Sequence, residues 1–90
     1  GSGYAGLEAL LELSPEFIKV DRTFVSGIDQ DVLRQDMLRM LLSVAEKTGA
    51  KIIGEGLDTL EELSMLAELG VHYGQGWLFG HPTPLRANDD

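Results

Sequence analysis

The sequence predicts an α/β fold in which about three short parallel strands alternate with helices. Apolar runs rich in β-branched or aromatic residues occupy 17–20, 51–56 and 77–79, and stretches with helical spacing of apolar residues separate them. This alternation is typical of right-handed crossovers, which build a parallel sheet. With 90 residues, the chain has room for one small domain.

The first half of the chain predicts helix, strand and helix. Apolar positions 4, 7, 10 and 11 favour an amphipathic helix that ends before Pro15, and FIKV at 17–20 follows as the first strand. From Val32 to Thr48, positions 33, 37, 40, 41, 44 and 45 share one helical face, and Gly49 is placed as the C-cap. We expect that face, with its two methionines, to pack into the core.

The second half predicts strand, helix and strand. KIIGEG at 51–56 is the second strand, and Thr59 and Glu62 have capping-box spacing at the start of a helix that ends at Gly70. WLF at 77–79 predicts the third strand, and HPTP at 81–84 predicts the end of regular structure. We expect a domain over 1–85 and a polar tail over 86–90.

Composition excludes several classes of partner. The chain has 7 Lys and Arg against 15 Asp and Glu, a formal net charge of −8, which disfavours binding to polymeric nucleic acid or to an anionic membrane. It has no cysteine, so disulfides and thiolate metal sites are excluded, and we expect a cytoplasmic location. No apolar run reaches the roughly 20 residues that span a bilayer.

Polar side chains gather at the predicted carboxyl ends of the strands, where parallel α/β folds place their active sites. Side chains alternate along a strand, so Lys19 and Asp21 share one face, and Glu55 ends the second strand between two glycines that permit close approach of a ligand. Asp58 and Gln75 lie at the second and third strand ends. We regard these residues as the candidates for chemistry.

Structural roles remain open beside the functional ones. Lys19 and Asp21 could form an ion pair that closes the end of the sheet, and Gln75 could be a turn residue hydrogen-bonded to backbone. His72 and His81 fit no metal-ligand spacing, so we interpret them as surface or turn residues. The acidic pair that opens the helix near residue 61 is explained by the helix dipole.

Four segments together resemble the last part of an EAL domain, the phosphodiesterase domain that hydrolyses the bacterial second messenger cyclic di-GMP. They are GSGYAGL, FIKVDRTFV, KIIGEGLDT and ELGVHYGQGWLFGHPTP, in family order, from Gly1 to about Pro84. The resemblance implies a modified (β/α)8 barrel, a TIM-like fold of about 250 residues. Residues 1–85 would then be its C-terminal portion.

The resemblance also implies roles for the candidate residues. Lys19 matches the catalytic lysine near the scissile phosphate, and Asp21 matches the aspartate that accompanies it at the substrate. Glu55 matches the glutamate assigned as general base or second-metal ligand, and Gln75 matches a substrate-binding glutamine. Asp58 stands where the family usually has a longer glutamate, which puts its reach to the site in doubt.

The same resemblance implies Mg²⁺ or Mn²⁺ as cofactor, although the Glu-Ala-Leu signature and most metal ligands lie upstream of the matched segments. We expect the parent domain to hydrolyse cyclic di-GMP to linear pGpG and the 90-residue chain alone to be inactive. One alternative is a degenerate domain that binds cyclic di-GMP or a protein partner without hydrolysis. Another is a structural fragment that forms a homo-oligomer through exposed sheet edges.

Overall fold

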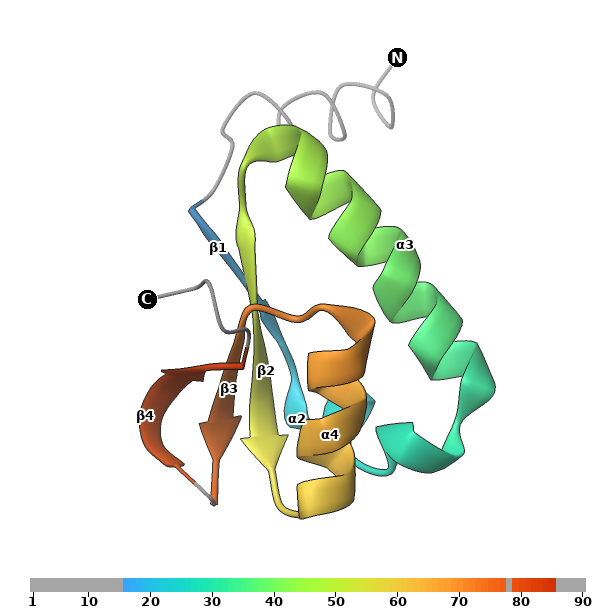
Figure 1. The fold of residues 1–90 in the computed structure, drawn as a ribbon, viewed down its shortest axis with the longest axis vertical. Coiled ribbons are helices and arrows are strands. Elements are labelled where there is room, and N and C mark those ends of the chain that lie inside the picture. The colour runs from blue at the N-terminus through green and yellow to red at the C-terminus, as the bar shows by residue number, and fades with distance from the viewer. Residues whose placement is uncertain (1–15, 78, 86–90) are drawn as a thin grey trace.

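The computed structural model describes residues 16–77 and 79–85, which form one four-stranded sheet with helices packed on it (Figure 1). The predicted helix over 4–13 lies outside the described residues. In chain order the elements are β1 (Phe17–Val20), α2 (Arg22–Val25), the 3-10 turn η1 (Ile28–Gln30), α3 (Val32–Thr48), β2 (Lys51–Leu57), α4 (Leu60–Leu69), β3 (Tyr73–Gly76) and β4 (Phe79–Pro84).

The sheet has the order β1-β2-β3-β4, with β1, β2 and β3 parallel and β4 antiparallel to β3. The predicted α/β class with three alternating parallel strands is confirmed. The third parallel strand is YGQG at 73–76, however, and not WLF, and HPTP continues the sheet as β4 instead of ending regular structure.

Close packing explains why a glycine-rich segment forms a strand. A Cβ at Gly74 would lie 2.6 Å from Cδ1 of Leu57, so glycine lets β3 approach the end of β2. The prolines of β4 lie on an edge strand, where a missing N–H leaves no gap in an interior ladder. Propensity alone disfavours both strands, and tertiary packing decides their structure.

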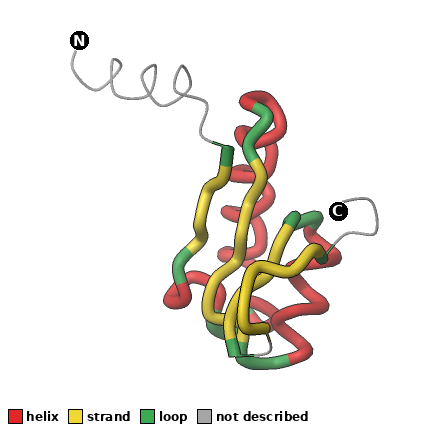
Figure 2. Tube along the Cα trace, turned by 90° about the vertical axis from the view of Figure 1, so that its left-hand side faces the viewer, coloured by secondary structure: helices red, strands yellow, loops and turns green. Residues whose placement is uncertain are grey.

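The long helices α3 and α4 cover the same face of the sheet (Figure 2). Buried Val20, Ile52 and Leu57 of the strands pack with Leu38 of α3 and Leu66 of α4. At Gly54 a Cβ would lie 2.5 Å from Cδ1 of Leu66, so the missing side chain allows α4 to sit close against β2. One face of the sheet therefore carries the core.

The face of α3 that packs on the sheet overlaps the predicted one only at Leu41 and Ala45. Leu38 and Ala45 are fully buried, whereas Met37 and Met40 are 48% and 70% exposed, so the prediction that they pack into the core is wrong. Apolar residues cover two adjacent faces of this helix, and periodicity cannot tell which one meets the sheet. The other exposed apolar residues of α3 are Val32, Leu33 and Val44.

Local signals place the helix ends as predicted. Asp31 caps α3 by accepting a hydrogen bond from the Arg34 N–H, and Gly49 ends the helix in the left-handed conformation at φ 78°. Thr59 and Glu62 form the predicted capping box at the start of α4. None of the described helices is long and apolar enough to cross a membrane.

Candidate functional site

The strand register brings three of the predicted site residues onto one face. Lys19 pairs with Ile53, and Glu55 lies directly opposite Gln75 on the neighbouring strand, about 4.8 Å away along the sheet. Because paired residues in a sheet project to the same side, Lys19, Glu55 and Gln75 share the face opposite α3 and α4. All three lie toward the carboxyl ends of parallel strands.

The same three side chains have no polar interaction within the described part of the chain. Lys19 is exposed and Glu55 and Gln75 are half-buried, and no hydrogen bond or ion pair joins any of their side chains to residues 16–77 or 79–85. Phe17 and Tyr73 form an edge-to-face pair on this face, with ring centroids 6.1 Å apart. This aromatic pair therefore lies on the same face as three polar side chains that make no hydrogen bond to other described residues.

An irregularity at the end of β2 sets the position of Glu55. The register between β2 and β3 shifts between Glu55 and Leu57, where Gly56 has a φ of 77°. The Leu57 carbonyl accepts a hydrogen bond from the Trp77 N–H at 2.9 Å, which closes the bulge. A bulge re-aims the neighbouring side chains, and such features are common next to active sites.

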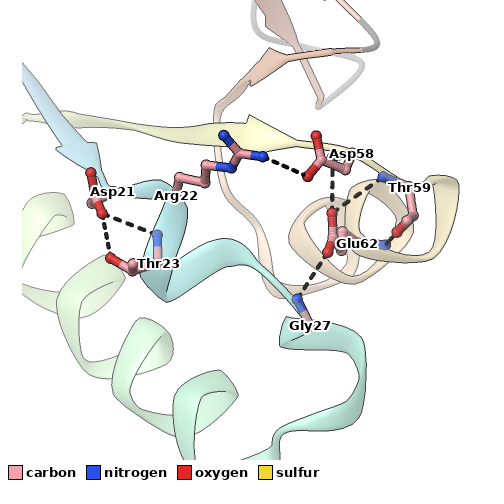
Figure 3. A network of polar contacts seen from close by, with 7 residues as sticks. All are labelled: Asp21, Arg22, Thr23, Gly27, Asp58, Thr59 and Glu62. Carbon is pink, nitrogen blue, oxygen red and sulfur yellow. Dashed lines mark hydrogen bonds and ion pairs between the residues drawn. The ribbon is translucent and has the colours of Figure 1, made fainter.

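Asp21 caps α2, so its carboxylate has a structural contact as well as a place at the strand end. Its Oδ2 accepts hydrogen bonds from the Thr23 hydroxyl and from the Thr23 N–H, the latter at 3.0 Å (Figure 3). The hydrogen bond from the hydroxyl is the largest of the influences that hold the pKa of Asp21 below its usual range. The described structure contains no ion pair between Lys19 and Asp21, so that structural interpretation is wrong.

Asp58 forms an ion pair with Arg22, which was not among the residues predicted from the sequence. Arg22 Nη2 lies 3.5 Å from Asp58 Oδ2, and the two side chains are 71% and 42% exposed (Figure 3). The pair links the segment after β1 to the segment after β2. Arg22 directly follows Asp21 in the sequence, but a contact across 36 residues has no signature in a single sequence.

The described residues supply at most some of the ligands that a metal ion would need. Carboxylate oxygens are the ligands that Mg²⁺ and Mn²⁺ prefer, and Glu55 presents one carboxylate on the open face. Residues 16–77 and 79–85 contain no group of three His, Cys, Asp or Glu residues that could hold a metal ion. His72 has a backbone contact instead, because its Nδ1 accepts a hydrogen bond from the Ile52 N–H at 3.0 Å.

A depression of about 340 Å³ flanks β1. Its lining residues come from β1, α2, α3 and the connection between β1 and α2, and none comes from β2 or β3: Lys19, Val20, Asp21, Phe24, Met37 and Leu41. It therefore shares Lys19 and Asp21 with the candidate residues but does not extend to Glu55 or Gln75.

Comparison with known proteins decides the family. The family model described as the EAL domain matches residues 1–82. This chain belongs to the EAL domain family. The register gathers on one face of the sheet Lys19, Glu55 and Gln75, the three positions that the sequence resemblance assigns to a lysine, a glutamate and a glutamine of the family.

Several relatives of this chain are named as cyclic di-GMP phosphodiesterases. The chain is 35% identical to the probable cyclic di-GMP phosphodiesterase PdeA of Escherichia coli over 94% of its own length and 12% of the relative's. It is 33% identical to the cyclic di-GMP phosphodiesterase PdeL of the same organism, over 93% of this chain and 23% of that one. The chain thus spans less than a quarter of either relative.

A solved EAL structure has the same fold over nearly all of this chain. BlrP1 of Klebsiella pneumoniae, solved as a complex with manganese and cyclic di-GMP, aligns with a TM-score of 0.74 and 34% identity. The alignment covers 94% of this chain and 22% of that one. The sheet of Figure 1 is therefore part of a TIM-barrel fold of the EAL type.

Proposed function

We propose that residues 1–85 are the C-terminal portion of an EAL domain that hydrolyses cyclic di-GMP to linear pGpG. The observation that supports this most directly is the shared face of Lys19, Glu55 and Gln75, whose side chains have no polar partner within the described residues. Family membership and the names of the relatives supply the substrate.

Each residue would act according to its chemistry. The Lys19 ammonium would bind the phosphodiester and balance charge that develops on its oxygens as water attacks phosphorus and the P–O3′ bond breaks, which releases the 3′-hydroxyl. Glu55 would accept the proton of that water as general base or would hold a metal ion. Gln75, opposite Glu55, would bind the dinucleotide through its amide, and Asp21 would contribute a carboxylate held in place by Thr23.

Mg²⁺ or Mn²⁺ fits the carboxylate chemistry of Glu55, although a complete site needs ligands beyond those described. When bound, such an ion polarises the phosphate and lowers the pKa of a bound water. The divalent ion also explains how a chain with a net charge of −8 could bind a dianionic dinucleotide.

Substitutions in a complete EAL domain that carries this sequence test the proposal. We expect Glu55→Gln to lower kcat by about 10²- to 10⁴-fold, and Lys19→Ala by about 10²- to 10³-fold, in release of pGpG with Mn²⁺. Glu68→Gln, an equivalent change at an exposed position on α4, should leave the rate unchanged. Binding of cyclic di-GMP without turnover by the unmodified domain would instead support the degenerate binding domain.

The 90-residue chain by itself provides a second measurement. We expect it to release no pGpG with Mn²⁺, because Glu55 is the one assigned metal ligand within it. Turnover by the purified chain would show that its own residues complete an active site.

A further inference from the structure

Glu62 is a buried carboxylate that the proposed chemistry does not use. It lies in the first turn of α4 and is only 5% exposed, and the other buried polar side chain among the described residues is Gln35. A buried charge is costly unless hydrogen bonds compensate it. Capping of α4 accounts for part of that compensation but not for all of it.

The two oxygens of Glu62 bind different loops (Figure 3). Oε1 accepts hydrogen bonds from the N–H groups of Asp58 at 2.9 Å and Thr59 at 3.2 Å, at the end of β2. Oε2 accepts a hydrogen bond from the Gly27 N–H at 2.8 Å, 35 residues earlier in the chain. One side chain thus links the segment that follows β1 to the segment that follows β2.

Both segments carry candidate site residues. Gly27 ends the stretch that starts at Asp21, and Asp58 lies three residues beyond Glu55. The ion pair of Arg22 with Asp58 joins the same two segments, but it is long and exposed, and such pairs contribute little. Charge-assisted hydrogen bonds in a buried place are stronger, so Glu62 is the principal link.

We propose that Glu62 is a positioning residue that holds the carboxyl ends of β1 and β2 in fixed relation, and with them Lys19 and Glu55. This inference rests on the proposed phosphodiesterase function. Capping of α4 alone would require only Oε1 and the Thr59 hydroxyl, which accepts from the Glu62 N–H at 3.1 Å. The hydrogen bond from the Gly27 N–H to Oε2 has no part in capping α4 and therefore requires another explanation.

Three variants in a complete EAL domain separate the two roles. Glu62→Ala removes both links, and we expect kcat per folded molecule to fall about ten- to hundredfold with KM little changed. Glu62→Gln keeps one acceptor oxygen, which can serve only one loop, so its kcat should lie between those of the wild type and Glu62→Ala. Thr59→Ala weakens the start of α4 but leaves the carboxylate in place, so its kcat should match wild type.

Either of two results would overturn the proposal. One is a folded Glu62→Ala variant with wild-type kcat. The other is a Thr59→Ala variant that loses as much kcat as Glu62→Ala, since helix capping would then explain both.

Hydrogen exchange measures the link without reference to activity. We expect the Gly27 amide to be protected in the wild type and in Thr59→Ala, and to lose protection in Glu62→Ala. A Gly27 amide that exchanges freely in the wild type would refute the link itself. If the wild type fails to hydrolyse cyclic di-GMP while the Gly27 amide follows the expected pattern, the proposed function fails and the link between the loops stands.

Discussion

Asp21 and Glu62 are carboxylates whose pKa values lie below the ordinary range for different physical reasons. Asp21 is exposed, and the hydroxyl and N–H of Thr23 stabilise its ionised form. For Glu62, burial raises the pKa, but hydrogen bonds from three backbone N–H groups outweigh burial and lower it. Both side chains are therefore anionic at neutral pH, but only Glu62 is buried enough to affect stability strongly.

Glu62→Gln should make the free energy of unfolding of the domain less dependent on pH in the acid range. Because the folded-state pKa of Glu62 is lowered, its ionised form contributes stability above about pH 4.5, and this contribution disappears as the pH falls through the folded pKa. We expect the wild type to exceed Glu62→Gln by about 1–2 kcal/mol in free energy of unfolding at neutral pH. The difference should shrink as the pH is lowered below 4.5 in urea titrations.

Glu68→Gln provides the comparison for this titration, because Glu68 is exposed on the same helix. Its difference from the wild type should stay near zero at every pH. A stability difference between wild type and Glu62→Gln that is constant from neutral to acid pH would mean that ionised Glu62 does not act as described.

At the scale of elements, the end of β2 depends on Gly56. Its φ of 77° is unfavourable for other residues, and a Cβ there would lie 2.5 Å from Cγ of Arg22. Gly49, at the end of α3, has a similar φ of 78°, but no atom lies within 4 Å of the position that its Cβ would take. Substitution of either glycine would therefore strain the backbone, and only at Gly56 would it also cause steric crowding.

We expect Gly49→Ala to lower the free energy of unfolding by about 1–2 kcal/mol through the left-handed backbone alone. Gly56→Ala should cost more, because α2 must move away from β2, and it should also lower kcat by displacing Glu55. Chemical denaturation and steady-state kinetics of both variants in a complete domain measure the two effects. Equal losses of stability would show that Arg22 does not crowd Gly56.

The elements that were predictable from sequence are those set by local chemistry. The helical spacing of apolar residues and the C-capping Gly49 predicted α3 at Val32–Thr48, the same bounds that the structure has. The strand Tyr73–Gly76 was not predicted, because its glycines favour a turn and only contact with Leu57 makes them suitable for a strand. The orientation of α3 was predicted only in part, at Leu41 and Ala45, since its apolar residues cover more than one face.

In the candidate site too, contacts between residues close in the sequence were predicted, and contacts between residues far apart in the sequence were not. Alternation along a strand predicted that Lys19 and Asp21 share a face. The register places Lys19 on one face with Glu55 and Gln75, whereas Asp21 lies beyond the end of β1 as the N-cap of α2. The capping box predicted one contact of Glu62, but the bond to Gly27 spans 35 residues. Pairings across such distances require the folded sheet, because no local pattern encodes them.

At the scale of the whole molecule, the described sheet has one covered face and two unequal edges. The helices α3 and α4 cover one side (Figure 2), and the strand register places Lys19, Glu55 and Gln75 on the other. The outer edge formed by β4 contains Pro82 and Pro84, which lack the N–H groups needed for pairing. The outer edge formed by β1 has no such protection, so it is the edge available for pairing with another strand.

We expect the 90-residue chain in isolation to self-associate through the β1 edge, which would complete ladder hydrogen bonds that the described residues leave unmade. Light scattering at low micromolar concentration should then give a mass above that of one chain. Phe17→Glu, which places a like charge on β1 where the side chain is 49% exposed, should shift the mass toward the monomer. Leu60→Glu adds the same charge at a 67% exposed position on α4 and should leave association intact. A folded wild-type monomer at these concentrations would refute edge pairing, and equal effects of the two variants would assign association to net charge instead.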